Sequence, residues 1–526
     1  MPTHAEIKTT SSNDAGLAIN EFYAPAPPCE HPALEQWREV RLETGRPFRP
    51  DWKMYVGHGS PEMTADRLAL LRRLGVDSLL LAWDLPSQLG LDPDHRLSAS
   101  QVGRAGVSCS SLEDMRTICS KIDLSALTSL GLLANSVGWY GFGLALEVLR
   151  ETDATETPVM MQNDPLKEFT ARGTDILRPE DALRLACDVL EYAVDHDVPG
   201  YAMTVSSNHF DVAGAGPVLG LAFALANGVA YMDEVVRRGV DPASAAKKIA
   251  LFINERSDFM VTAALFRTTR VLWADILKVR YDVPYTQAPV HLMGYAHGLE
   301  TAVEPLVNVA RVAVSVSAAT LGGADSLCAA AYDEALRIPS EDAAALALRT
   351  IQVASAEHGV GDSVDPLSGS FKFERLGSEI EHDVRAELRR IEEEGGAVAC
   401  IDNGYVIGRI SERQGHRTEM LESGRRPWIG VNVHADSQSR ALFAGASAPD
   451  ISVSETEREL VDRVRERKFS PSRDVDAALE KLTDEVASHR NCLSATRVAL
   501  RGGATVEEIT DATRRGLENG PEGGPR

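Results

Sequence analysis

The sequence predicts an α/β protein, a (β/α)₈ barrel of the TIM type with an extended N-terminal arm and a helical C-terminal tail. From about residue 75, short apolar segments typical of buried strands recur about every 30 to 50 residues. Segments with helical periodicity lie between them, for example the one that begins at Asp181. Six to eight strand–helix units in about 320 residues favour a closed parallel barrel over an open sheet.

The order of elements divides the chain into four parts. Residues 1–45 show no sustained periodicity and are expected to form the extended arm. The barrel is assigned to residues 46–395, with a charged helix at about 378–394; a loop-rich linking region follows at 396–450, and a helical tail with a disordered end at 451–526. Six strands of the barrel are expected at 76–83, 127–135, 157–164, 200–207, 248–255 and 289–296.

Composition excludes several classes of protein. The chain has 526 residues with 54 Lys and Arg against 77 Asp and Glu, a net charge of −23, which disfavours a general affinity for nucleic acid or for an anionic membrane. No apolar segment reaches the roughly 18 residues of a membrane span, and the N-terminus does not resemble a secretory signal. Seven scattered cysteines without zinc-ligand spacing are interpreted as small buried hydrophobic residues, so we expect no metal site and a cytoplasmic location.

Polar residues gather where five of the expected strands end. A single polar residue at a strand end is often only a loop cap, but a repeated pattern indicates a site, because the carboxyl ends of barrel strands form the active-site face. Two of the strands are rich in small residues, which leaves open whether a channel runs along the barrel axis or small residues are merely tolerated near the rim. The polar positions are Asp84, Asn135, Gln162 to Asp164, Ser206 to His209, and Asn254 to Arg256.

Generic catalytic motifs are missing from the sequence. There is no G-x-S-x-G nucleophile elbow, no Walker A loop, no H-E-x-x-H and no G-x-G-x-x-G after a strand. A barrel with polar residues at its mouth but no evident nucleophile or metal cage points to chemistry supplied by a cofactor.

Several blocks of sequence resemble a known family. The segment MMQNDPLKEFTARGT (160–174), together with residues 102–115, 221–239, 321–344, 362–376 and 424–434, closely resembles the large, catalytic subunit of adenosylcobalamin-dependent acyl-CoA mutases, the methylmalonyl-CoA and isobutyryl-CoA mutase family. The resemblance covers about residues 40–520, with the blocks in the family's order. It implies a barrel whose interior admits the pantetheine arm of coenzyme A, and a radical rearrangement that depends on adenosylcobalamin.

The resemblance assigns catalytic residues by position. His209 matches the histidine that hydrogen-bonds the migrating thioester carbonyl, where an N–H would stabilise charge on that oxygen. The alternative is a core histidine with internal partners. Gln162 matches a glutamine beside the substrate. The family's Gly-Tyr-His is here Ser207-Asn208-His209, which places Ser207 at the substrate and Asn208 among the catalytic residues.

Two further positions bear on substrate choice. Arg172 matches the arginine that pairs with the free carboxylate of methylmalonyl-CoA, and Tyr55 matches the tyrosine that assists it if one residue is deleted. Family members that act on isobutyryl or 2-hydroxyisobutyryl thioesters have apolar and Gln residues there. The pair therefore favours a carboxylated acyl-CoA, with a surface ion pair as the alternative role of Arg172.

The resemblance also assigns cofactor contacts and a partner. Glu334 matches a glutamate that contacts the adenosyl ribose, Asp325 replaces a Gln of the same block, and HLMGYAH (291–297), which begins at His291, replaces the family's H-x-Q-T. The cobalamin-binding pattern D-x-H-x-x-G does not occur in the 526 residues. We therefore expect the cobalt ligand on a separate small cobalamin-binding subunit and a hetero-oligomer.

The leading hypothesis is an isomerase that rearranges the carbon skeleton of a carboxylated acyl-CoA of the methylmalonyl-CoA and succinyl-CoA type. An isobutyryl-CoA or 2-hydroxyisobutyryl-CoA mutase is one alternative. A non-catalytic, degenerate subunit of a mutase is another, favoured by Asn208 and by the altered segment 291–297. A barrel lyase or aldolase is a third, which the absence of a Schiff-base lysine at a strand end disfavours.

Overall fold

The computed structural model describes residues 9–12, 17–20, 23–43, 49–255, 258–287, 290–443, 453–470 and 473–520, and the statements below concern these residues. The expected disordered end at 521–526 and part of the linking region, 444–450, lie outside them.

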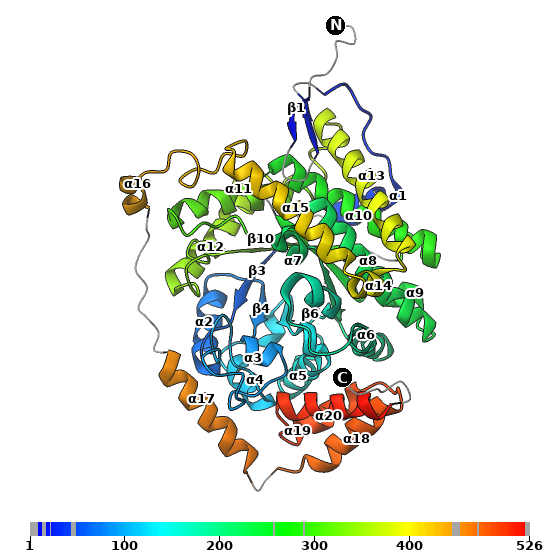
Figure 1. Ribbon diagram of the computed structural model, residues 1–526, viewed down its shortest axis with the longest axis vertical. Helices are drawn as coiled ribbons and strands as arrows, with labels where there is room; N and C mark the ends of the chain where they lie inside the picture. The colour runs from blue at the N-terminus through cyan, green and yellow to red at the C-terminus, as the bar shows by residue number, and fades with distance from the viewer. Residues whose placement is uncertain are drawn as a thin grey trace. The chain divides into compact units, whose positions relative to one another are not determined.

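The main sheet has nine strands in the order β7-β6-β5-β4-β3-β11-β10-β9-β8. Every pairing with a defined register is parallel. Only Ala202 separates β7 from β8, the two ends of this order, so both belong to one interrupted strand and the sheet forms an eight-stranded barrel flanked by helices (Figure 1). The predicted (β/α)₈ class is confirmed. The strands are β3 (Asp51–Val56), β4 (Ser78–Ala82), β5 (Ser129–Leu133), β6 (Val159–Gln162), β7 (Gly200–Tyr201), β8 (Met203–Ser206), β9 (Ile249–Glu255), β10 (His291–Ala296) and β11 (Ser326–Ala329).

Six expected strand segments coincide with β4, β5, β6, the pair β7 and β8, β9 and β10, and the structure adds β3 and β11. The sequence of β3, DWKMYV, has no apolar run because a charged side chain interrupts it. That side chain, Lys53, is nevertheless buried, and its ammonium donates to the Ser129 hydroxyl at 2.7 Å. The β11 sequence, SLCA, lacks the β-branched residues that usually mark a strand.

The chain divides into two compact units. The first comprises residues 1–52, 206–229 and 250–446, and the second comprises residues 53–205, 230–249 and 447–526. Helix α8 (Pro217–Arg237) contributes residues to both. The other helices of the first unit are α1 (Pro32–Glu43), α7 (Asn208–Phe210), α10 (Phe259–Tyr281), α11 (Asn308–Leu321), α12 (Glu341–Gln352), α13 (Phe371–Glu393), α14 (Ala397–Asp402), α15 (Tyr405–Glu422) and α16 (Ser437–Leu442). Those of the second are α2 (Pro61–Arg73), α3 (Leu85–Gln88), α4 (Leu112–Cys119), α5 (Gly138–Glu151), α6 (Pro179–Asp195), α9 (Pro242–Ala246), α17 (Val453–Lys468), α18 (Asp476–Ala487), α19 (Leu493–Arg501) and α20 (Val506–Asn519).

Among the described helices, α8 alone is long and apolar enough to cross a membrane. However, 72% of its most apolar window is buried inside the protein, and a buried core helix meets the same criterion. Six of the seven cysteines are also buried, and Cys29 is half-buried.

Two expectations about irregular segments are wrong in part. The arm is not extended throughout, because α1 places Leu34 and Trp37 on one face, where they pack with Val271 in a small buried cluster. The linking region, expected to be loop, contains α14 and α15. The apolar positions of α15 are sparse, and only Val406, Ile410 and Met420 are buried, so its helical periodicity is weak in the sequence.

Ion pairs with a buried carboxylate hold the tail helices against the barrel part of the second unit. Glu147 of α5, whose side chain is fully buried, accepts hydrogen bonds at 2.7 Å from Arg497 and from Arg501 of α19. Helix α20 begins with a capping box in which Thr505 and Glu508 bond each other's backbone amides. Figure 1 shows α19 beside α5 at the end of the chain.

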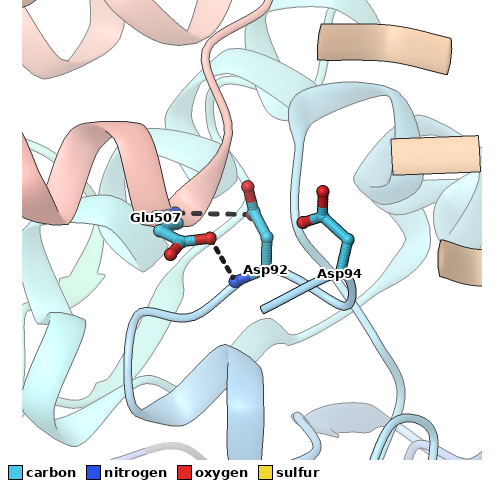
Figure 2. Close-up of side chains that lie close together, drawn as sticks. All are labelled: Asp92, Asp94 and Glu507. Atoms are coloured by element: carbon cyan, nitrogen blue, oxygen red, sulfur yellow. Dashed lines mark hydrogen bonds between the residues drawn. The ribbon is translucent and has the colours of Figure 1, made fainter. Parts of the chain in front are cut away.

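A second attachment involves three carboxylates, Asp92, Asp94 and Glu507, whose oxygen atoms lie within 4.8 Å of one another. Figure 2 shows two hydrogen bonds between Asp92 and Glu507, which lies at the start of α20. The backbone N–H of each residue donates to the carboxylate of the other. The Lys468 ammonium lies 2.9 Å from Asp92 Oδ2 and 2.8 Å from Asp94 Oδ1. Burial raises the pKa of Asp92 to about 6, and the Lys468 charge opposes that rise. Lys468 thus supplies the cation of this cluster, which joins α17 and α20 to the loop after α3.

Candidate active site

Gln162 and Tyr55 meet inside the second unit. Gln162 ends β6, and its Nε2 donates to the Tyr55 hydroxyl of β3 at 2.9 Å. Two strands, β4 and β5, separate β6 from β3 in the sheet, so this bond crosses the barrel interior. The Gln162 side chain is 1% exposed, and its Oε1 has no hydrogen-bond partner among the described residues. The structure therefore brings two predicted site residues together and leaves an acceptor atom for a ligand.

Arg172 lies at the end of the π-helical turn η4 (Glu168–Arg172), which stops at Gly173 in the left-handed region (φ 67°). Its Nη1 donates to Gln88 Oε1 at 2.9 Å and lies 3.4 Å from Glu168 Oε2. Burial alone would raise the pKa of Glu168, but the charges of Lys167 and Arg172 hold it below its usual value. Arg172 therefore has an ion-pair partner, as the alternative reading of the sequence proposed, although that partner is buried.

The Arg172 guanidinium is only partly used by these contacts. Both contacts involve Nη1, and among the described residues no partner is found for Nε or Nη2. The side chain is 28% exposed. A guanidinium held by one nitrogen keeps a two-donor edge, the geometry that suits a carboxylate.

His209 stands in the first unit, in the short helix α7 that follows β8. Its Nδ1 lies 3.0 Å from the Ser206 hydroxyl, and its ring meets that of Phe252 edge-on at 6.3 Å between centroids. When Ser206 donates to Nδ1, the proton of the neutral ring is on Nε2. Ser206, the last residue of β8, thus orients the His209 ring.

The two residues before His209 in the sequence are buried. The amide and hydroxyl of Ser207 both donate to the carbonyl oxygen of Phe252 in β9, at 2.9 and 3.2 Å. This pair of bonds fixes the start of α7 to the sheet, so the Ser207 hydroxyl donor is committed within the protein. Asn208 is buried.

Glu334 and His297 both follow carboxyl ends of strands in the first unit. His297 comes directly after β10, and its ring stacks on Tyr295 at 4.9 Å and 9°. Burial raises the pKa of Glu334 to about 7, and the nearby His297 opposes the rise. His297 was not among the residues predicted from the sequence, although it directly follows the strand expected at 289–296.

His291 and Asp325 lie at the amino ends of the same strands. His291 begins β10, where its Nε2 lies 3.1 Å from the Ser326 hydroxyl, and Asp325 directly precedes β11. Asp325 is paired with Arg41 and with Arg270, the latter at 3.0 Å. These two predicted cofactor residues therefore lie at the opposite end of the strands from Glu334, and their assignment to the cofactor site is not supported. The sequence alone did not reveal which end of a strand they occupy.

We expect Asp325→Asn to lower the free energy of unfolding by about 3 to 5 kcal/mol, because it leaves the buried Arg270 and the half-buried Arg41 without their counter-charge. Urea unfolding measures this loss. Asp66→Asn is the matched control, since Asp66 pairs with Lys121 at an exposed position and should cost under about 1 kcal/mol. An Asp325→Asn protein as stable as the wild type but deficient in cofactor binding would contradict the structural role.

The raised pKa of Glu334 predicts a pH dependence of stability. The folded protein keeps this proton up to a pH of about 7, whereas an unfolded glutamate releases it near 4.5. The contribution is therefore complete below pH 4.5 and is lost as the pH rises to about 7. We expect the Tm of the wild type to fall relative to that of Glu334→Gln over this window. Parallel curves for the wild type and Glu334→Gln would contradict the assignment.

The fold and the side chains at its strand ends define a class of protein. A parallel eight-stranded barrel carries an amide, a guanidinium, an imidazole and a protonatable carboxyl group beyond the carboxyl ends of its strands. In (β/α)₈ enzymes this end of the strands carries the active site. The family model for methylmalonyl-CoA mutase matches residues 44–519, and the chain belongs to this family.

Three relatives illustrate the relationship. The chain is 30% identical to the 2-hydroxyisobutanoyl-CoA mutase large subunit of Aquincola tertiaricarbonis, over 97% of this chain and 88% of that one. It is 31% identical to ethylmalonyl-CoA mutase of Methylorubrum extorquens, over 87% of this chain and 68% of that enzyme. It is 29% identical to methylmalonyl-CoA mutase of Escherichia coli (strain K12), over 83% of this chain, and it spans 61% of that enzyme's length. These relatives are CoA mutases, which are isomerases, and the chain is an isomerase of this kind.

Proposed function

We propose that the protein is the barrel subunit of an adenosylcobalamin-dependent mutase that rearranges a carboxylated acyl-CoA of the methylmalonyl-CoA and succinyl-CoA type. The observation that carries this proposal is the state of Arg172, which is held through Nη1 and keeps the Nε and Nη2 donors for an anion. A substrate carboxylate would complete this fork with two parallel N–H···O bonds.

The remaining groups have roles on the reacting part of the substrate. We assign His209 Nε2 as the donor to the thioester carbonyl, because Ser206 holds the opposite ring nitrogen. Gln162 contributes an acceptor, its Oε1, and Tyr55 holds the amide in place. Gln162 is buried and His209 and Tyr55 are half-buried, so the reacting part of a bound substrate would be largely shielded from water.

The fit to an adenosyl group rests on carboxyl groups after β10 and β11. Glu334 combines partial burial with a pKa of about 7, and Glu300 Oε1 is buried without a hydrogen-bond partner among the described residues. Such oxygens suit ribose hydroxyls, so we assign Glu334 to hold the adenosyl ribose. When bound, adenosylcobalamin supplies the radical that starts the rearrangement.

We also propose a small cobalamin-binding subunit as the partner, and hence a hetero-oligomer in the cytoplasm. The support is that a relative which matches 97% of this chain is named a large subunit. The cobalt ligand would belong to that partner.

A second candidate is a mutase for 2-hydroxyisobutanoyl-CoA or isobutyryl-CoA. Two observations favour it: the extent of the match to the 2-hydroxyisobutanoyl-CoA mutase large subunit, and the buried Glu168 that already neutralises part of the Arg172 charge. A substrate without a carboxylate would leave that internal pair intact.

The test is to combine the chain with its small subunit and adenosylcobalamin and to assay methylmalonyl-, ethylmalonyl-, isobutyryl- and 2-hydroxyisobutyryl-CoA separately. We expect turnover of a carboxylated substrate to exceed that of the others. Faster turnover of either uncarboxylated thioester supports the second candidate. Absence of turnover with all four in a complex that binds cobalamin supports a non-catalytic subunit.

A further inference from the structure

The side chain of Asn135 is buried, yet it makes no hydrogen bond with the part of the chain that the structure describes. It lies two residues beyond the carboxyl end of β5, at the start of the 3₁₀ turn η2 (Asn135–Val137), and is 3% exposed. Both of its amide atoms, Oδ1 and Nδ2, lack a partner. None of the roles assigned above uses this residue.

Asn135 follows the strand that pairs with the strand of Gln162. Leu133 of β5 is in register with Gln162 of β6, and the Ala134 amide donates to the Gln162 carbonyl at 3.3 Å. Gln162 Oε1 also lacks a partner there, and so does Trp83 Nε1, directly after β4 on the other side of β5. The ends of β5 and β6 therefore carry two acceptors and one donor group without partners.

The neighbouring buried asparagine shows a different pattern. Asn163 Nδ2 donates to the carbonyl oxygen of Ala186 at 3.1 Å and approaches that of Ala202 at 3.5 Å. A buried amide at this level of the barrel thus can find backbone partners, and Asn135 does not. Since a buried polar group without a partner destabilises the folded state, leucine, which has nearly the same shape, would be the better residue for stability alone.

A group that both donates and accepts would satisfy these atoms together. We propose that Asn135 and Gln162 form an amide-binding subsite. Asn135 Nδ2 donates to the carbonyl of the ligand amide, and Gln162 Oε1 accepts its N–H; a primary carboxamide can in addition donate its second N–H to Asn135 Oδ1. This inference rests on the proposed function, which supplies two sources of amides: the pantetheine arm of the acyl-CoA and the carboxamide side chains of cobalamin.

The test compares Asn135→Leu with the wild type in two measurements. Without ligand, we expect the Tm of the variant to rise by about 1 to 2 °C, because an unsatisfied amide is removed. With propionyl-CoA, we expect the Kd to increase about tenfold, the loss of roughly one hydrogen-bonded group. Propionyl-CoA has no carboxylate, so this result is independent of Arg172 and separates failure of the subsite from failure of the carboxylate assignment.

A second ligand and two further variants complete the test. An unchanged Kd for propionyl-CoA with about tenfold weaker adenosylcobalamin binding by the two-subunit complex assigns the amide to the corrin. Asn135→Asp, which keeps the size but not the donor, should weaken the same ligand without raising the Tm. Asn308→Leu removes a buried asparagine that donates to Thr301 and Tyr332 carbonyls, and it should only lower the Tm. If Asn135→Leu also lowers the Tm and binds both ligands as tightly as the wild type, the subsite does not exist.

Discussion

Replacing Arg172 with glutamine should reduce kcat/KM for a carboxylated acyl-CoA by about 10²- to 10³-fold and for isobutyryl-CoA by less than about threefold. The substrate carboxylate would lose a bidentate, charge-assisted contact, an effect of about 3 to 4 kcal/mol. The fold should survive, because Lys167 still neutralises the buried Glu168. Steady-state kinetics with both substrates measure the difference.

Two other variants sharpen this result. Arg172→Lys keeps the charge but not the fork, and it should lose about tenfold on the carboxylated substrate. Arg178→Gln is the matched control, because Arg178 forms an exposed pair with Asp181 at 2.7 Å and should leave both activities unchanged. Equal losses on the two substrates with Arg172→Gln would refute the role of Arg172 in binding a carboxylate.

Replacing His209 with alanine should lower kcat by about 10²- to 10³-fold and change KM little, the behaviour of a donor whose hydrogen bond strengthens as charge develops on the thioester oxygen. Ser206→Ala should lower kcat by a smaller factor, about tenfold, because it removes only the contact that orients the ring. Both variants are assayed on the substrate that the wild type turns over fastest.

His196 provides the control for this substitution. It stacks on Tyr192 at 3.8 Å at the end of α6, so His196→Ala should leave kcat at the wild-type value. If His209→Ala raised KM alone and left kcat unchanged, His209 would contribute uniform binding and no stabilisation of the reacting carbonyl.

The fold was predictable where the physical signal is local. Buried parallel strands are apolar on both faces, so β4 and β9 stand out in the sequence. Strand β3 does not, because the burial of Lys53 depends on Ser129 of a distant strand. Helix α15 was missed because few of its side chains are buried.

The site was predictable only in part for a related reason. The position of Gln162 at a strand end follows from the apolar run before it. At β10 and β11 the sequence does not show which end of the strand a polar residue occupies. His291 and Asp325 were therefore grouped with Glu334, and His297 was not assigned to the site. The contacts of Arg172 with Gln88 and Glu168 depend on a π-helical turn and on the one-turn helix α3, which no sequence period indicates.

The most direct test of the account is a competition in a single reaction. The chain, its small subunit and adenosylcobalamin are mixed with equal concentrations of methylmalonyl-CoA and isobutyryl-CoA, and the rearranged products are quantified by mass spectrometry at early times. We predict at least about a tenfold excess of the carboxylated product, the selectivity expected from one charge-assisted contact. Equal amounts, or an excess of the uncarboxylated product, would contradict the claim that Arg172 selects an acyl-CoA with a carboxylate.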